Sequence, residues 1–189
     1  MALTNDAQLA ARLDRLRTHG ITRDPGTMHS EPPGPWYYEQ VELGMNYRMT
    51  DLQAALAVSQ LRRLEKFVTR REDIARTYDE ALAQLPLTLP WQHPDTASAW
   101  HLYVVQIDSS RARKNRDEVF REMRRAGVHV NVHYIPVHTQ PYYRQLGFRE
   151  GHFPMAELYY SRTLTLPIYA ALTPQEQATV IQTLHRLLH

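Results

Sequence analysis

The sequence of 189 residues predicts an α+β fold, in which a helical first part leads into a small sheet covered by helices. Residues 50 to 85 keep helical spacing almost without interruption, and no strand is evident before them. After residue 86, strand patterns alternate with helix patterns, which is typical of a small antiparallel or mixed sheet covered by helices. The apolar stripes of the first part lack a partner within it, so we expect them to need another surface.

The first predicted helix covers residues 7 to 18. Asn5 or Asp6 can cap it, and its leucines fall on one stripe. Gly20 follows its end, where the left-handed conformation that closes many helices favours glycine. Residues 22 to 43 are rich in proline, glycine and aromatic residues, so we expect a functional loop there and not a disordered one.

A long helix is predicted from Thr50, which forms a capping box with Gln53, to about residue 85. This length exceeds that of a usual globular helix, so we expect a break near residues 66 to 68, although neither glycine nor proline marks it.

In the second half, strands rich in β-forming residues are predicted at residues 101–108, 128–133 and 163–166. Helices alternate with them. One begins at Asn115 or Asp117 and runs to residue 126, one covers residues 154–162, and the last is capped by Thr173 and Glu176. Residues 134–153 contain several prolines and glycines and are predicted to form a loop.

Composition argues against several functional classes. The sequence contains no run of eighteen apolar residues, so we expect no membrane span. No signal peptide, with a basic start followed by an apolar stretch, is evident. The absence of cysteine excludes disulfides and thiolate metal sites, and it fits a cytoplasmic location. The net charge is only +2, and the arginines alternate with acidic residues, so we expect solvated helix faces and no nucleic-acid binding.

The histidine spacing raises a metal alternative. His129 and His133 share one face of a predicted strand, and His138 follows five residues later. They could bind zinc if a third ligand came near. Because the chain has no cysteine and no pair of histidines at helical spacing on a helix, we expect no metal site.

Residues 44 to 56 are the most informative stretch, because Asn46 and Arg48 come just before a helix N-terminus. Free N–H groups and the helix dipole favour anions there. An asparagine amide can donate to phosphate oxygens, and an arginine can hold a phosphate or carboxylate with two hydrogen bonds. A purely structural alternative is that Asn46 shapes a turn and Arg48 pairs with Asp51.

This stretch resembles the G-x-N-x-R-[ML]-x-[DE]-x-Q-A-A signature of nucleotide-sugar aminotransferases of the DegT/DnrJ type, which depend on pyridoxal 5'-phosphate (PLP). Further segments resemble the same family in order, so that the resemblance covers nearly the whole chain: residues 3–22, 99–103, 133–143 and 164–169. The residues of these motifs resemble most those of transaminases that make UDP-4-amino-4,6-dideoxy-N-acetyl-β-L-altrosamine, on the pseudaminic acid route.

The resemblance implies the C-terminal portion of a fold type I PLP-dependent transferase that works as a homodimer. Residues 1–49 would then be a helix and active-site loop left from the large cofactor domain. Residues 50–85 would be a long connecting helix, and residues 86–189 the C-terminal small α/β domain.

The resemblance also implies roles for individual residues. Asn46 would reach the PLP phosphate of the partner subunit, and Arg48 would lie beside that site. Glutamate would give its amino group to a keto-deoxy nucleotide sugar. The sugar-nucleotide pocket would be lined in part by His133, Tyr134, His138 and Tyr143.

In that family, the lysine that forms the Schiff base with PLP lies upstream of the segment that matches residues 3–6, so the resemblance places it before Met1. Lys66 and Lys114 are the only lysines, and both lie among charged residues and not in the desolvated setting that this chemistry needs. We therefore expect no catalytic residue in the chain and no transamination by it alone. A non-catalytic sugar-nucleotide-binding or dehydratase-type relative and a self-associating interaction module remain alternatives.

Overall fold

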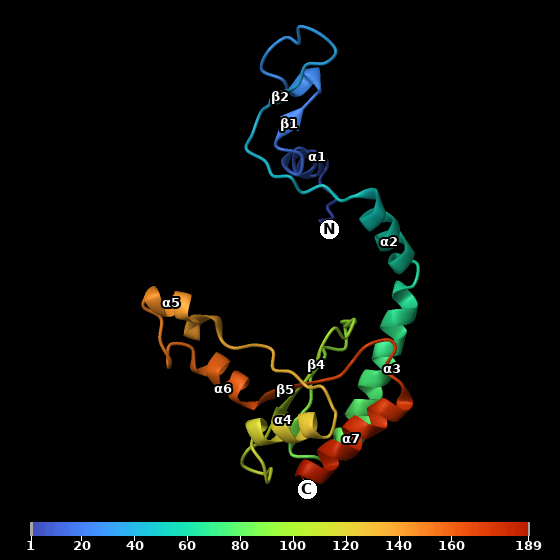
Figure 1. Ribbon diagram of the computed structural model, residues 1–189, viewed down its shortest axis with the longest axis vertical. Coiled ribbons are helices and arrows are strands. Elements are labelled where there is room, and N and C mark those ends of the chain that lie inside the picture. The colour runs from blue at the N-terminus through green and yellow to red at the C-terminus, as the bar shows by residue number, and fades with distance from the viewer. Residues whose placement is uncertain (1, 189) are drawn as a thin grey trace. The chain divides into compact units, whose positions relative to one another are not determined.

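The computed structural model describes residues 2–188, which divide into two compact units between Arg62 and Arg63. In Figure 1, the first unit is coloured from blue to teal and the second from green to red. The mixture of helices and a small sheet agrees with the predicted α+β class.

The described part of the first unit contains α1 (Ala7–Leu16), α2 (Asp51–Leu61), the short 3-10 helix η1 (Pro25–Thr27) and a pair of antiparallel strands, β1 (Ile21–Thr22) and β2 (Glu39–Gln40). The carboxylate of Asp6 caps α1, as predicted. The helix ends at Leu16 instead of Thr18. The expectation that this half has no strand is wrong, because strands of two residues are too short to show an alternating pattern.

The predicted long helix is broken in two. The capping box of Thr50 and Gln53 begins α2, as predicted. The second helix, α3 (Leu64–Leu82), starts after an interruption at Arg62 and Arg63, a few residues before the expected break. Since arginine is a good helix former, residue type gives no signal for this position.

Across residues 2–62, no hydrophobic side chain is buried. Leu3, Leu43 and Leu52 are each more than 80% exposed. Apolar surface of this extent marks a region that packs against something else. The expectation that the first part needs a partner surface therefore agrees with the structure of this unit.

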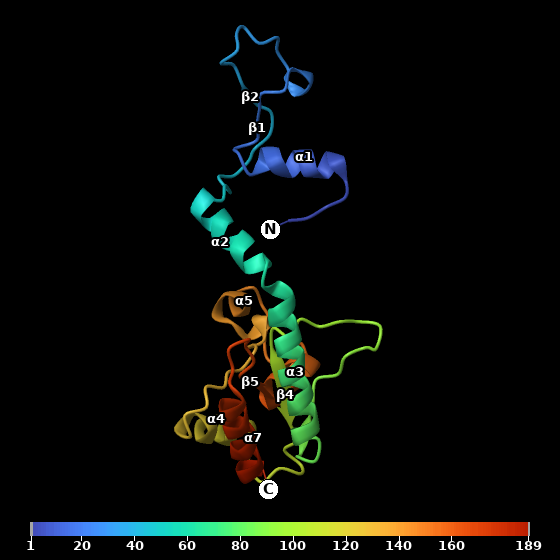
Figure 2. The ribbon, with the colours of Figure 1, turned by 90° about the vertical axis from the view of Figure 1, so that its right-hand side faces the viewer.

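The second unit is built on an antiparallel sheet with the strand order β3 (Leu87–Thr88), β4 (Tyr103–Ile107), β5 (Thr163–Leu166). Its helices are α3, α4 (Arg116–Arg125), α5 (Pro141–Gln145), α6 (Pro154–Arg162) and α7 (Pro174–Leu188). In both views α7 runs beside α3 (Figures 1 and 2). No helix within residues 2–188 is long and apolar enough to cross a membrane.

The apolar core of the described residues lies wholly in the second unit. At its centre the rings of Tyr78 and Tyr103 lie 5.0 Å apart. The Tyr103 hydroxyl donates to the Asp79 carboxylate over 2.6 Å, and the Tyr78 hydroxyl donates to the Pro167 carbonyl over 2.9 Å. Burial raises the pKa of both tyrosines, so both hydroxyls remain protonated donors.

The predicted strand at residues 128–133 is not present as a strand. Val128 and Val130 are buried, as their alternation indicated, but only Asn131 pairs with Thr165 in an isolated bridge. The alternation therefore reported which side chains face the core and not backbone pairing. Conversely, β3 was missed, and the predicted loop at residues 134–153 contains the 3-10 helix η2 (Val137–Thr139) and α5.

Candidate functional site

The segment that carries Asn46 and Arg48 is fastened to the C-terminal end of α1 by backbone hydrogen bonds. The Met45 N–H donates to the Leu16 carbonyl over 2.7 Å, and the His19 N–H donates to the Met45 carbonyl over 2.9 Å. The Tyr47 N–H donates to the Arg17 carbonyl over 2.9 Å. These bonds hold the segment in a defined position on α1.

Glycines and one carboxylate allow this close approach. Glu42 accepts hydrogen bonds from the side chains of Arg12 and Arg15, at 3.1 Å and 3.2 Å. Gly20 has a φ of 69°, in the left-handed region, and a Cβ there would collide with the Glu42 carbonyl. A Cβ on Gly44 would collide with the Gly20 nitrogen.

We expect Gly44→Ala to detach this segment from α1. The added Cβ would lie 2.5 Å from the His19 carbonyl carbon and 2.8 Å from the Leu16 carbonyl oxygen, and backbone atoms cannot move aside as flexible side chains can. Overpacking of this kind costs about 1–3 kcal/mol, so the Met45 and Tyr47 amides should exchange with solvent about tenfold faster or more. Gly26→Ala is the matched control, because its nearest contact would be an ordinary 3.5 Å. Unchanged exchange in Gly44→Ala would contradict this account of the loop.

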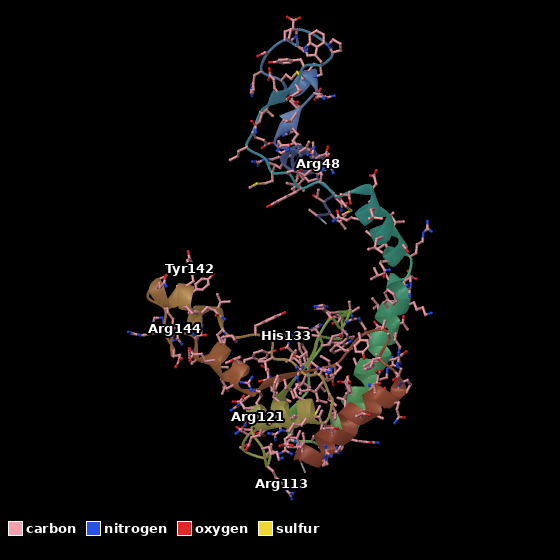
Figure 3. All side chains as sticks on the ribbon, in the orientation of Figure 1. Arg48, Arg113, Arg121, His133, Tyr142 and Arg144 are labelled. Atoms are coloured by element: carbon pink, nitrogen blue, oxygen red, sulfur yellow. The ribbon has the colours of Figure 1, made fainter. Side chains whose placement is uncertain are left out.

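Within this segment, Asn46 and Arg48 contact each other. The Arg48 Nε donates to the Asn46 Oδ1 over 3.0 Å, and both residues are exposed. Because a guanidinium has only donors, it fixes the Asn46 oxygen toward itself and leaves the amide NH2 as a donor. Among the described residues, Arg48 (labelled in Figure 3) makes no ion pair with Asp51, which the structural alternative required.

The same segment has an apolar side. Met45, Tyr47 and Met49 line a groove of about 870 Å³ in the first unit, whereas Asn46 and Arg48 are not among its lining residues. Side chains two apart on an extended segment share a side, so polar and apolar groups alternate here. Leucines complete much of the groove, at positions Leu3, Leu13, Leu16 and Leu43.

The loop between β1 and β2 is also ordered by a carboxylate. Glu39 accepts hydrogen bonds from the His29 N–H at 2.6 Å, the Ser30 N–H at 3.0 Å and the Tyr37 hydroxyl at 3.2 Å. Trp36, which is 71% exposed, lies on this loop. The predicted functional loop is thus internally bonded and presents an aromatic side chain to solvent.

We expect this loop to loosen in acid. The hydrogen bond from the His29 backbone lowers the pKa of Glu39 below its usual value of 4.5. The stabilisation by Glu39 is therefore complete above the unfolded pKa, near 4.5, and is lost as pH falls through the lower folded pKa. The His29 amide resonance should move upfield in this window, and Glu39→Gln should remove the transition. A transition that persists in Glu39→Gln would assign it to another group.

Two of the predicted sugar-pocket residues lie at the edge of the sheet. The His133 Nδ1 lies 2.8 Å from the Thr165 Oγ1 on β5, and His133 is half-buried (Figure 3). Tyr134 follows across a cis peptide bond, and its ring lies edge-on to the His133 ring at 4.6 Å. Tyr134 is 69% exposed, so this ring can contact a ligand.

The other two lie in η2 and α5. Tyr143 is 37% exposed and has its ring 5.4 Å from Tyr142 and 6.4 Å from Phe148. His138 is only 7% exposed, and its Nε2 lies 2.7 Å from the Glu157 carboxylate. That hydrogen bond lowers the pKa of Glu157. The structure thus supplies His138 with a protein partner that the sequence did not reveal.

A second cavity involves a residue that sequence reasoning did not single out. Arg71, on α3, donates to the carbonyls of Trp100 and His101 over 2.8 Å and 3.3 Å. It helps to line a cavity of about 370 Å³ in the second unit. The sequence pattern of α3 gave no reason to select Arg71, rather than another arginine of this helix, as a candidate site residue. The other lining residues are Leu64, Phe67, Val68, Ala99, His101 and Ala170.

The lysines and histidines form no obvious reactive centre. Lys66 is exposed on α3, and Lys114 is half-buried just before α4. The Nδ1 of His129 lies 3.1 Å from Arg124 Nη1. Within residues 2–188, no group of three or more His, Asp or Glu side chains is placed to hold a metal ion.

The second unit is thus a small antiparallel sheet with its helices, and the first unit, which buries no apolar side chain among residues 2–62, displays the Asn46 amide and the Arg48 guanidinium. The model of the DegT/DnrJ/EryC1/StrS aminotransferase family matches residues 1–185, and the chain belongs to this family. The family prediction is therefore confirmed.

Individual relatives agree with this assignment. The chain is 40% identical over 185 residues to the spore coat polysaccharide biosynthesis protein SpsC of Bacillus subtilis, covering 96% of this chain and 47% of that protein. It is similar to the structure of the putative sugar aminotransferase Spr1654 from Streptococcus pneumoniae in its PMP form, with 28% identity and a TM-score of 0.85 over 97% of this chain and 46% of that one.

It is also similar to PseC of Helicobacter pylori, an aminotransferase involved in the biosynthesis of pseudoaminic acid. The identity is 25% and the TM-score 0.82, over 98% of this chain and 47% of that one. The chain spans about half the length of the curated relatives it matches. Because the identity to SpsC exceeds that to PseC, the likeness does not single out the pseudaminic acid route.

Proposed function

We propose that this chain is the C-terminal part of a PLP-dependent aminotransferase that moves an amino group from glutamate to a keto-deoxy nucleotide sugar for surface-glycan biosynthesis. Membership of the aminotransferase family supports the reaction class. The name of SpsC supports a polysaccharide pathway, and the structure of PseC, an aminotransferase involved in the biosynthesis of pseudoaminic acid, is compatible with the narrower proposal that the product is UDP-4-amino-4,6-dideoxy-N-acetyl-β-L-altrosamine.

The observation that carries this proposal is the two-sided segment at residues 45–49. Its apolar side chains line a groove in a unit without a buried apolar residue among those described, and its polar side chains form an exposed donor pair. A segment of this kind suits an interface in which the apolar side packs and the polar side completes a site. We infer that the assembly is a homodimer and that this segment serves the partner subunit.

The donor pair fits the phosphate of PLP. The Asn46 amide NH2 and the Arg48 guanidinium present donors and a positive charge, which is the chemistry that phosphate oxygens require. When bound, PLP acts as the electron sink that makes transfer of the amino group feasible. The role of Asn46 and Arg48 is to hold and orient the phosphate, so that the cofactor keeps one position during the reaction.

The proposed sugar wall consists of residues at the sheet edge and in α5. Tyr134 and Tyr143 expose rings that can stack on sugar or base faces, and their hydroxyls can add hydrogen bonds. His133 contacts Thr165 through its Nδ1 and in this way positions the segment in which the wall begins. We propose that specificity for a nucleotide sugar arises here, and that His138 belongs to the same wall.

We propose that the chain alone does not transaminate. A lysine that anchors PLP needs a desolvated setting, whereas Lys66 is exposed on a helix. The test is to incubate the chain with PLP, reduce with borohydride and locate any adduct by mass spectrometry. We expect no saturable, site-specific adduct. A stoichiometric adduct on Lys66 or Lys114 would overturn the proposed inactivity.

The alternatives predict other results when binding of PLP and of a UDP-sugar to the chain are both measured. Saturable binding of a UDP-sugar by a chain that does not bind PLP would favour a non-catalytic sugar-nucleotide-binding module of the same fold. A stable dimer that binds neither ligand would favour an interaction module, which the exposed apolar groups of the first unit support.

A further inference from the structure

Residues 137–157 form an arm that extends from the sheet and comprises η2, α5 and the first residues of α6 (Figure 1). Its side chains are largely exposed, and every residue from 141 to 156 is exposed. The arm therefore has almost no apolar core to hold its shape. Polar contacts must contribute much of its order.

The Glu157 carboxylate makes several of these polar contacts. The Glu157 Oε1 lies 2.7 Å from the His138 Nε2, and the two Glu157 oxygens accept from the Gly151 N–H at 2.8 Å and 3.0 Å. The Phe153 ring covers the imidazole at 4.8 Å. Gly151 has a φ of 89°, in the left-handed region that favours glycine. Glu157 thus joins η2, the turn at Gly151 and α6.

We propose that Glu157 is a positioning residue that acts through His138 to fix α5, and with it Tyr142 and Tyr143, as one wall of the sugar-nucleotide pocket. The link to the pocket rests on the proposed function. His138 then serves to hold the wall, because its Nε2 is engaged by Glu157 and its ring by Phe153. The tyrosines, which are exposed, make the contacts with the ligand.

The His138–Glu157 contact is more buried than the ion pair between Arg144 and Glu150 in the same arm. The His138 side chain is 8% exposed and that of Glu157 26%, whereas Arg144 and Glu150 pair with side chains that are 54% and 75% exposed (Arg144 and Tyr142 in Figure 3). Exposed ion pairs contribute little because water competes for both partners. A hydrogen bond between a sheltered carboxylate and an imidazole contributes more. Glu150→Gln is therefore the matched control for substitutions of Glu157.

The first measurement is amide hydrogen exchange along the arm of the full chain. In Glu157→Ala, the amides of residues 137–151 should exchange about tenfold faster or more, as expected on loss of a charged hydrogen bond, while those of β4 and β5 stay unchanged. Glu157→Gln keeps an acceptor oxygen and should restore most of the protection. Glu157→Leu keeps the volume only and should not. Rescue by Leu but not by Gln, or no effect of Ala, would overturn the positioning role.

A second experiment tests the contribution of the His138 imidazole. His138→Phe keeps a ring against Phe153 but removes the nitrogen that contacts Glu157. It should increase exchange in residues that Glu157→Ala also affects, but by less, because the contact between Gly151 and Glu157 remains. The double variant should be no worse than Glu157→Ala alone. Additive effects would show that the two residues act separately and would contradict the proposal.

The final measurement ties the arm to the ligand, with UDP-N-acetylglucosamine as the probe. If the chain binds it, Glu157→Ala should raise the dissociation constant about tenfold, and Glu150→Gln should leave it unchanged. Equal binding by Glu157→Ala would overturn the link between Glu157 and the pocket. If the unaltered chain does not bind the probe, the proposed sugar wall is contradicted, and the exchange data still decide whether Glu157 orders the arm.

Discussion

Leu164→Ala should lower the free energy of unfolding of the second unit by about 2–5 kcal/mol, the range observed when a buried leucine is truncated. Leu164 is fully buried on β5, where it pairs with Val105 of β4 at the centre of the core. Its truncation leaves a cavity around which the structure relaxes only in part. Since domains of this size are stable by about 5–15 kcal/mol, the variant should lose a large part of its stability.

Urea unfolding followed by tryptophan fluorescence would measure this effect. Trp100 packs against Tyr103, with ring centroids 5.7 Å apart, and so reports on the core. Leu158→Ala on α6 is the control, because that side chain is 41% exposed and its loss should cost much less. A similar shift of the midpoint for both variants would show that the core does not lie around Leu164.

Local signals allowed the sequence to predict many element starts. The capping boxes at Thr50, Asn115 and Thr173 each pair a side chain with a backbone N–H three residues away. Such bonds depend only on neighbouring residues, so their spacing is visible in the chain. The helices at residues 116–125, 154–162 and from 174 onward appear where these signals and Pro154 placed them.

Contacts between distant residues explain what could not be predicted. Residues 128–133 alternate as a strand does, but pairing requires a neighbouring edge, and only Thr165 of β5 meets Asn131. The bond between His138 and Glu157 spans nineteen residues, and nothing in either local sequence announces it. The same holds for the contact of Arg71 with the carbonyl of Trp100.

The candidate site at Asn46 and Arg48 was likewise predicted only in part from the sequence. The position of Asn46 and Arg48 before a helix N-terminus predicted an anion site, and the family resemblance assigned that anion to the cofactor phosphate. Their mutual hydrogen bond and their separation from the apolar groove became visible only in the structure, where backbone hydrogen bonds hold residues 45–47 on the end of α1. The assignment of these residues to the cofactor phosphate stays a prediction, as do the roles of His133, Tyr134, His138 and Tyr143.

Arg48→Ala should weaken the binding of PLP through its phosphate by about 10- to 100-fold, because a charge-assisted hydrogen bond is worth about 1.5–3 kcal/mol. Arg48→Lys should recover only part of this, since an ammonium cannot offer the planar, two-pronged donor geometry of a guanidinium. Asn46→Ala should have a smaller effect, because it removes a neutral donor and the acceptor that orients Arg48. NMR titration with PLP would measure these constants, from the Asn46 amide signal in the variants of Arg48 and from the Arg48 Nε–H signal in Asn46→Ala.

Two controls are needed. One tests whether binding depends on the phosphate of PLP and not on its ring, and the other tests whether it depends on Arg48 in particular and not on the net charge of the chain. Pyridoxine has the same ring without the phosphate, so it should leave both side-chain signals unmoved. Arg62→Ala removes an exposed arginine at the end of α2 and should not change the affinity. If pyridoxine shifted the same signals, or if Arg62→Ala weakened binding as much as Arg48→Ala, the pair would be responding to an aromatic ligand or to net charge. An anion site built from Asn46 and Arg48 requires that neither occurs, because its energy comes from directed hydrogen bonds to phosphate oxygens.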